Sequence, residues 1–225
     1  MIAPGLPPEA KPGQLVALDL ELFKADKARL HRPTGVFACL SVAMDKKDRA
    51  DHLWLVEDQN DLPEVFERLK NGVWVFQNAA FDLRQLARWA KVPKVRVWDT
   101  MLVDQDLFGG YYSQFGLDDL VRRWLGKYMD KSGRDEFEGR ESLSLKMRKY
   151  ATNDAVATLA VAGKQAAYIK EHDEPLNCYF DIDELMIQST LAMKPERVDV
   201  DAWMDSAKEN MAQAAKLEAE RGFNP

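Results

Sequence analysis

Apolar, strand-forming runs alternate with stretches of helical periodicity along most of this chain. The expected strands are Leu15–Phe23, Gly35–Met44, His52–Glu57, Val73–Gln77 and Val95–Asp99. Apolar residues at helical spacing predict helices over Leu62–Lys70, Ala79–Lys91, Met101–Phe108, Leu117–Leu125 and from Leu143 to about Lys170. Asn78 stands at the expected N-cap of the second helix. Further helices are expected over Pro175–Ala192 and Val198–Arg221.

The order of these elements predicts the fold class. Three leading strands form a meander, and the strands that follow helices add in parallel through right-handed crossovers. We therefore expect an α/β protein of ribonuclease H-like arrangement, a mixed five-stranded sheet flanked by helices, with a C-terminal helical extension. Residues 1–14, rich in Pro and Gly, are expected to be a flexible lead-in, residues 15–172 the main domain, and residues 173–225 the extension.

Composition narrows the class of protein. The chain has 225 residues, 46% of them hydrophobic and 30% charged, which suits a globular protein with one good core. Its net charge of −6 argues against a large basic surface that wraps duplex nucleic acid. Cys39 and Cys178 cannot build a disulfide framework or a Cys/His zinc site, so a cytoplasmic location is expected, or the host cytoplasm for a viral protein. We find no secretion signal and no apolar run long enough to span a membrane.

The first strand combines an apolar sequence with two acids. Asp19 and Glu21 occupy alternate positions in Leu15–Phe23, and strand side chains alternate between faces, so both acids point to one side. Burying two like charges together is costly unless a cation compensates them. Clustered carboxylate oxygens favour Mg2+ or Mn2+ over zinc. The pattern predicts a divalent-metal site; the alternative, a solvent-exposed pair at a strand end, is disfavoured by the apolar neighbours on both sides.

Two further motifs carry acids on helices. Asp82 falls in the first turn of the helix that begins near Ala79, just beyond the carboxyl end of a strand, where open α/β sheets usually bind ligands. Tyr150 and Asp154 are four residues apart, so on a helix they share one face. Each motif alone has an ordinary explanation, since acids complement the dipole at a helix start and tyrosines occur on core faces. Their order on the expected elements makes the set far more specific than its members.

Together these motifs resemble the DEDD superfamily of 3′–5′ exonucleases, in its DEDDy branch, with the strongest likeness to the proofreading domain of family A DNA polymerases. The similar region runs from about Leu15 to Lys170 and includes Val97–Met101 and Gly116–Leu120. The branch is assigned from Tyr150, because the sister branch has a histidine at the position of Lys149. One departure is Leu22, where many members have threonine; an apolar residue there is compatible with packing against a terminal base.

The resemblance implies a two-metal mechanism. Two divalent cations, Mg2+ or Mn2+, about 4 Å apart would clamp the scissile phosphate. By motif position, Asp19 bridges both cations, and Glu21 and Asp154 hold the one on the side of the attacking water. Asp82 acts on the second cation, and Tyr150 orients the water. A tyrosine with a pKa of about 10 is mostly neutral at pH 7, so the cations do most of the activation.

The implied activity is hydrolysis of the terminal phosphodiester of single-stranded or frayed DNA, which releases nucleoside 5′-monophosphates during proofreading. Leu22, Asn78 and Phe81 are the expected substrate contacts, because every base offers a face for stacking. Expected partners are a single-stranded DNA 3′ end and a polymerase domain in the same or another chain; the ending Phe223–Pro225 resembles the approach to such a domain and suggests a fragment. Two alternatives stay open: ribonuclease D-like trimming of RNA 3′ ends, and a catalytically silent nucleic-acid-binding module. No role is assigned to the charged segment Lys24–Pro33.

Overall fold

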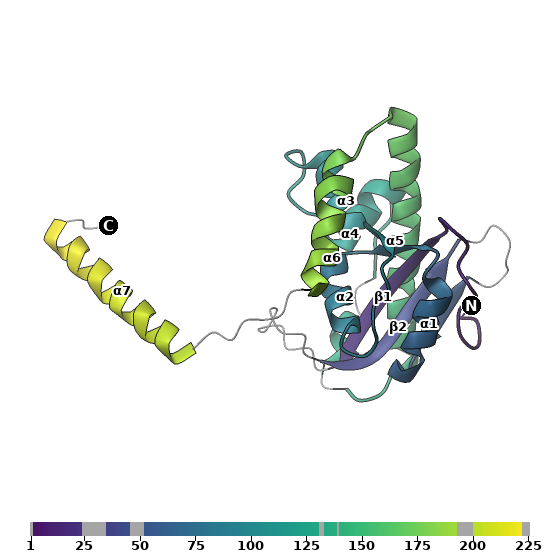
Figure 1. Ribbon diagram of the computed structural model, residues 1–225, viewed down its shortest axis with the longest axis horizontal. Helices are drawn as coiled ribbons and strands as arrows, with labels where there is room; N and C mark the ends of the chain where they lie inside the picture. Colours follow the sequence, from purple (N-terminus) through teal and green to yellow (C-terminus); the bar gives the residue numbers. More distant parts are fainter. Residues whose placement is uncertain are drawn as a thin grey trace. The chain divides into compact units, whose positions relative to one another are not determined.

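The structure, a computed structural model, describes residues 2–23, 35–45, 52–130, 133–138, 140–192 and 200–221. Its strands and helices follow the expected order (Figure 1). Two features of the sequence lie outside the described residues: the charged segment Lys24–Pro33 and most of the polar turn Asp45–Arg49.

The described residues contain a five-stranded sheet in the order β3-β2-β1-β4-β5. The strands are β1 (Leu15–Phe23), β2 (Val36–Met44), β3 (Leu53–Val56), β4 (Val73–Phe76) and β5 (Arg96–Asp99). β2 pairs antiparallel with both β1 and β3, whereas β4 pairs parallel with both β1 and β5. The predicted mixed sheet is therefore confirmed, and its parallel pairs follow from the helices that carry the chain back across the sheet.

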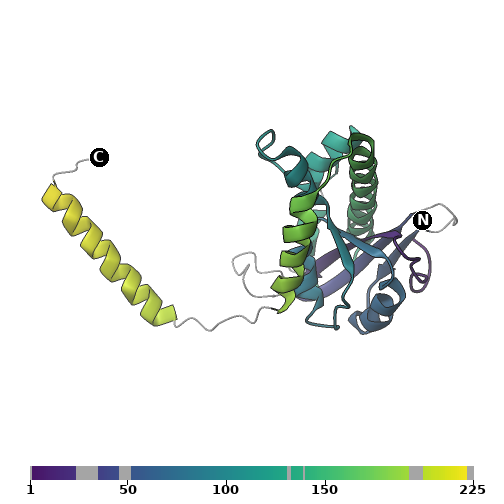
Figure 2. The same cartoon turned by 45° about the horizontal axis from the view of Figure 1, so that its top comes forward.

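Helices cover both faces of the sheet, and β1 contributes buried apolar side chains to each face (Figures 1 and 2). Leu18 and Leu20 point to the face where α1 and α2 pack, and Ala17 points to the other face, where it packs with Ala155 of α5. The second half of α5 extends beyond the sheet and packs against α4 (Figure 2). The bounds are α1 (Leu62–Leu69), α2 (Ala79–Leu86), α3 (Thr100–Phe108), α4 (Leu117–Leu125), α5 (Leu145–His172) and α6 (Glu184–Ala192).

Two helices are shorter than the sequence pattern predicts. α2 ends at Leu86 instead of Lys91, and beyond it the N–H groups of Arg88 and Trp89 bond to carbonyls three residues back, which tightens the turn. Pro93 then disfavours a helical residue before it. The predicted helix Pro175–Ala192 begins at Asn177 and contains a π-helical turn, Tyr179–Asp183, before it continues as α6.

The segment after α5 covers the outer edge of β5. The hydroxyl of Tyr179 accepts from the N–H of Asp99 at 2.8 Å and donates to the carbonyl of Val97 at 2.7 Å. The carboxylate of Glu184 accepts from the N–H of Val97 at 3.0 Å. These side chains take the hydrogen bonds that a further strand would make, and so protect the edge. The compact unit accordingly runs over Met1–Met193, past the boundary expected after residue 172.

The residues before β1 are packed against the domain. Ala3 and Ala10 are 7% and 4% exposed. The N–H of Ala3 donates to the carbonyl of Leu53 at 2.8 Å, and that of Ala10 to the carbonyl of Arg68 at 2.8 Å. These bonds hold the segment against β3 and α1, which the expectation of a flexible lead-in did not foresee.

A second unit, Lys194–Pro225, contains the helix α7 (Val200–Arg221). Its large apolar side chains are exposed, among them Trp203 and Met211 at 66% and 74%. In the part of the chain that the structure describes, no helix combines the length and the apolar character needed to cross a membrane.

Candidate active site

Three carboxylates converge where α5 crosses the end of β1. Asp19 and Glu21 alternate with Leu18 and Leu20, whose side chains belong to the core on the opposite face, so both acids point toward α5. α5 contributes Asp154, and one carboxylate oxygen of each acid lies within 4.8 Å of the others. Among the described residues, these three acids form the one group of at least three Asp, Glu, His or Cys side chains that could hold a metal ion.

Small residues let α5 approach the sheet closely at this point. Ala151 and Ala155, on either side of Asp154, have no exposed surface. Tyr150 lies one turn before Asp154 on the same helix and hydrogen-bonds to its carboxylate. Burial, followed by the charges of Asp154 and Glu21, raises the pKa of Tyr150 well above its usual range. The phenol therefore stays neutral and serves as a hydrogen-bonding group rather than as a phenolate base.

Asp82 reaches β1 from the other helix layer. The parallel pairing of β1 with β4 ends at Ala17 and Val75, and β1 continues beyond it. The backbone N–H of Leu20, in this continuation, donates to Oδ1 of Asp82 at 3.0 Å. Asp82 is therefore held against the strand that carries the first two acids, although the three converging oxygens do not include one of its own.

Burial raises the pKa of Asp82 to about 8; the hydrogen bond from Leu20 opposes this rise, and the charge of Asp99 adds to it. An unfolded aspartate has a pKa of about 3.9, so between about pH 4 and 8 the unfolded chain has lost a proton that the folded protein keeps. Stability must then fall as the pH rises through this window.

Asp82→Asn removes this ionisation. In EDTA, the unfolding free energy of the parent protein should fall relative to that of the variant by up to about 1.4 kcal/mol per pH unit between about pH 5 and 8. Urea unfolding of both proteins across this range measures the difference. A difference that stays constant with pH would contradict the raised pKa.

The helix α2 begins where the sequence predicts, and Asn78 occupies its N-cap position as expected. Its backbone is left-handed, with φ of 68°, and its side chain makes no capping bond. The carboxylate of Asp99 instead accepts from the N–H groups of Asn78 and Ala79, at 3.1 and 2.7 Å. It also accepts from Met101 and Leu102 at the start of α3, at 3.0 and 3.4 Å. One carboxylate thus caps both helices.

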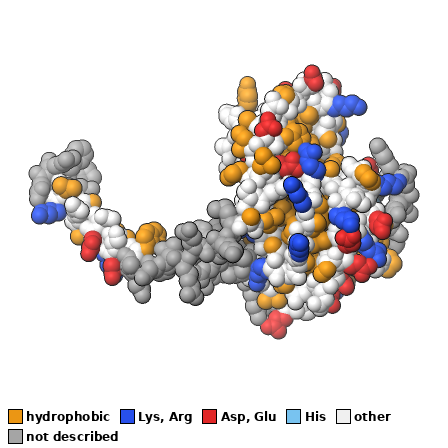
Figure 3. All heavy atoms as spheres, in the orientation of Figure 1, with side chains coloured by type: hydrophobic (Ala, Val, Ile, Leu, Met, Phe, Trp, Pro, Cys, Tyr) orange, Lys and Arg blue, Asp and Glu red, His pale blue; other side chains and the backbone are white. Residues whose placement is uncertain are grey.

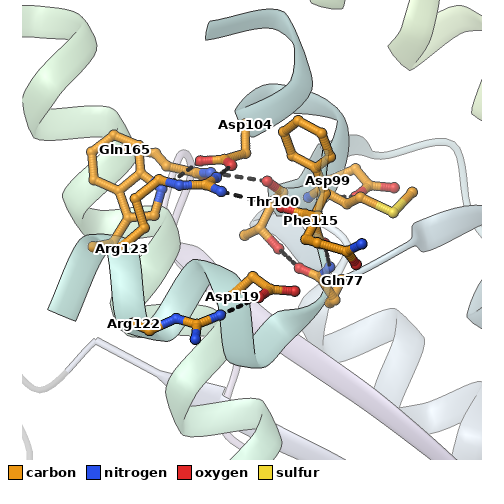
Figure 4. A network of polar contacts seen from close by, with 12 residues as sticks. Gln77, Asp99, Thr100, Asp104, Phe115, Asp119, Arg122, Arg123 and Gln165 are labelled. Carbon is orange, nitrogen blue, oxygen red and sulfur yellow. Dashed lines mark hydrogen bonds and ion pairs between the residues drawn. The ribbon is translucent and has the colours of Figure 1, made fainter. Parts of the chain in front are cut away.

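A polar network joins these helix starts to α5 (Figure 4). The hydroxyl of Thr100 contacts the carbonyl of Phe76 at 3.1 Å and Oε1 of Gln77 at 2.5 Å. The amide of Gln77 donates to the carbonyl of Phe115 at 2.8 Å, and the amide of Gln165 on α5 donates to the carbonyl of Thr100 at 2.9 Å. The network holds the loop before α2, the start of α3 and the second half of α5 in one arrangement.

Sequence reasoning assigned no role to Asp99 beyond its place in a motif similar to the exonucleases. An acid directly before a helix is a capping signature, and this signal could have identified its role at α3. No local pattern indicates its role at α2, because the two segments meet only in the folded sheet.

The expected substrate contacts differ in accessibility. Phe81, in the first turn of α2, is 38% exposed, and Asn78 is exposed in the loop before it. Leu22 is 6% exposed and belongs to the main core. It lies so close to Gly35 that a Cβ on that glycine would be 3.3 Å from the Cβ of Leu22. Of the two proposed base-packing side chains, Phe81 is therefore the accessible one.

The donor set of the site fits a hard divalent cation. Asp19, Glu21 and Asp154 offer only carboxylate oxygens, the ligands that Mg2+ and Mn2+ prefer. Their like charges repel one another in a partly buried position, and a cation would offset that repulsion.

The model of the family described as 3′-5′ exonuclease matches residues 9–166. The match covers well over half of the chain, and the protein therefore belongs to this 3′–5′ exonuclease family. No curated protein matches the sequence.

Solved structures share the fold at low sequence identity. The catalytic core of RRP6 from Trypanosoma brucei aligns with a TM-score of 0.64 and 16% identity over 87% of this chain and 51% of that chain. RNase D from Escherichia coli, described as an exoribonuclease involved in structured RNA processing, aligns with a TM-score of 0.60 and 20% identity over 87% and 49%. NrnC from Brucella melitensis with bound Mg2+ gives 0.58 and 14% over 80% and 83%.

The chain spans about half the length of the RRP6 and RNase D chains that it matches. These likenesses confirm the predicted ribonuclease H-like fold. They do not single out the proofreading domain of family A polymerases, which the sequence motifs led us to expect.

Proposed function

We propose that this protein is a metal-dependent 3′–5′ exonuclease of the DEDDy branch. It hydrolyses the terminal phosphodiester of a single strand and releases nucleoside 5′-monophosphates. The observation that carries the proposal is the convergence of the carboxylates of Asp19, Glu21 and Asp154, together with the hydrogen bond between Tyr150 and the last of them.

Each residue has a proposed role. Asp19, Glu21 and Asp154 hold the catalytic cations, with Asp82 acting on the second one. Such cations, when bound, activate a water and stabilise negative charge on the phosphate. The neutral hydroxyl of Tyr150 orients the water without taking its proton. Asp82, with its pKa of about 8, is mostly protonated at neutral pH in the metal-free protein, so it releases a proton as metal binds.

A single-stranded end suits the surface of the domain. The exposed ring of Phe81, next to Asn78, is available for base stacking, an interaction worth about 1–3 kcal/mol per base. On the face that Figure 3 shows, Lys and Arg side chains are interspersed with acidic and apolar ones. This mixture suits a few contacts with a short strand better than electrostatic wrapping of a duplex.

DNA is the first proposed substrate, and proofreading with a polymerase domain is its proposed context. The motif likeness to family A proofreading domains supports this context, as do the exposed apolar side chains of α7, which such a domain would cover. Trimming of RNA 3′ ends is the second candidate, favoured by the fold likeness to RNase D. A silent binding module is disfavoured, because the four acids and the tyrosine are all present.

Matched 5′-labelled DNA and RNA oligomers, incubated with Mg2+ or Mn2+ and separated on a denaturing gel, test the proposal. We expect the DNA to shorten from its 3′ end in a ladder, faster than the RNA, and EDTA to stop the reaction. Circular single-stranded DNA, which has no end, is the control and should stay intact. Faster shortening of RNA would favour the second candidate, and no metal-dependent cleavage of either oligomer would contradict the enzyme.

A further inference from the structure

A short segment between α4 and α5 packs directly on the side chain of Tyr150. It comprises residues 133–138 and includes the 3-10 turn Arg134–Phe137. At its start, Gly133 is buried against the tyrosine: a Cβ on this glycine would lie 2.7 Å from Cβ, 3.0 Å from Cγ and 3.1 Å from Cδ2 of Tyr150. Real Cβ atoms do not approach other carbons so closely, so only glycine leaves room for the tyrosine in its present position.

The end of the segment holds the same ring from another direction. Phe137 is 4% exposed, and its ring centroid lies 6.1 Å from that of Tyr150 at an interplanar angle of 61°, an edge-to-face contact. On its other side Phe137 lies 6.3 Å from the ring of Phe23 at the end of β1. The tyrosine ring is thus enclosed by the segment, and only 8% of Tyr150 is exposed.

Polar contacts tie the segment to the start of α5. The carboxylate of Glu136 accepts from Nζ of Lys146 at 2.5 Å and from the hydroxyl of Ser144 at 3.4 Å. Ser144 is itself the N-cap of α5 and accepts from the N–H of Met147 at 3.1 Å. Side-chain contacts of Glu136 therefore tie the segment to the start of the helix that carries Tyr150.

We propose that residues 133–138 are a positioning element for the catalytic tyrosine, with Gly133 as its decisive residue. The segment fixes the ring of Tyr150 so that its hydroxyl stays on the carboxylate of Asp154, beside the other acids of the site. A Cβ added at position 133 would push against the Cβ of Tyr150 and displace the side chain. The hydroxyl, at the far end of the ring, would then move away from the carboxylate of Asp154. The inference rests on the proposed exonuclease function.

Gly133→Ala tests the proposal, and Gly163→Ala is the matched control. Gly133 precedes α5, and Gly163 lies within it. A Cβ on Gly163 would meet nothing within 4 Å. In single-stranded oligomer cleavage with Mg2+, we expect Gly133→Ala to lower kcat by about 100-fold with KM changed by less than about threefold, since small misplacements of catalytic groups have effects of this size. The control should keep the parental kcat and KM.

A second background separates positioning from general damage to the fold. If Gly133 acts through the tyrosine hydroxyl, Gly133→Ala should cost less than about threefold in kcat when added to Tyr150→Phe. An equal loss in both backgrounds would overturn the proposal, as would a parental kcat for Gly133→Ala. Should Gly133→Ala fail to fold, Phe137→Leu replaces it in the same cycle, with a smaller loss of kcat expected in the parent and none in Tyr150→Phe.

Nitration with tetranitromethane reports on the tyrosine without any need for activity. Tyr111 and Tyr128 are 87% and 88% exposed and should be nitrated in every variant, whereas Tyr150 should react only in Gly133→Ala. Peptide mass spectrometry reads all three sites in one digest. If the parent degrades neither DNA nor RNA but Tyr150 becomes reactive in the variant, the exonuclease function fails while the packing role stands. A Tyr150 that reacts equally in parent and variant overturns the positioning role.

Discussion

Replacing Asp19 by Asn should lower the rate of 3′-end cleavage by about a thousandfold or more, equivalent to about 4 kcal/mol of transition-state stabilisation. Asp19 lies in β1, and one of its carboxylate oxygens is within 4.8 Å of an oxygen of both Glu21 and Asp154. Asparagine keeps the shape of the side chain but removes the charge that a cation requires. The expected loss is therefore in metal binding and rate together.

The fold should survive this change. Asp19 contributes one of three converging like charges, so removing it relieves repulsion in the metal-free protein. The unfolding temperature of Asp19→Asn in EDTA should equal or exceed that of the parent. Mn2+ binding by titration calorimetry and single-turnover cleavage then report the site alone.

Asp173→Asn is the matched control for Asp19→Asn. Asp173 is the exposed C-cap of α5 with a left-handed backbone, φ of 53°, which asparagine also tolerates. The same chemical change there should leave cleavage and Mn2+ binding at parental levels. Parental cleavage by Asp19→Asn would rule out the assignment of the site.

Replacing Asp99 by Ala should destabilise the domain by about 3 kcal/mol. The side chain is 1% exposed, and its carboxylate accepts backbone N–H groups at the starts of both α2 and α3. Loss of a cap costs about 1 kcal/mol, and a buried N–H without a partner costs about 1–3 kcal/mol. Burial also raises the pKa of Asp99, a sign of the desolvation cost that offsets part of this gain.

For a chain of this length, such a loss lowers the unfolding temperature by roughly 10 °C. Asp99→Asn keeps one acceptor oxygen and should lose less. Asp58→Ala is the control, because Asp58 caps only a short exposed turn through the N–H of Asn60, at 2.9 Å, and its loss should cost about 1 kcal/mol or less. Equal shifts for Asp99→Ala and Asp58→Ala in calorimetry would show that the double cap does not stabilise the domain as described.

The sequence by itself determined the local parts of this protein. The two-residue period of Leu15–Phe23 placed Asp19 and Glu21 on one face, and helical spacing placed Tyr150 and Asp154 on one face. Which residues share a face depends only on the backbone geometry of a single strand or helix, so the sequence of that one element is enough to predict it. The order of strands and helices predicted the mixed sheet, because few sheet topologies join elements in this order without connections that cross one another.

The tertiary structure decided the relations between segments that are far apart along the chain. Asp99 caps a helix that begins 20 residues earlier, and Tyr179 bonds to the backbone of β5 across 80 residues. Position 133 requires glycine because the side chain of Tyr150 occupies the space that a Cβ would need. Such contacts leave no periodic pattern in the sequence, because the partner that gives each residue its role is brought beside it only when the sheet and its helices have packed.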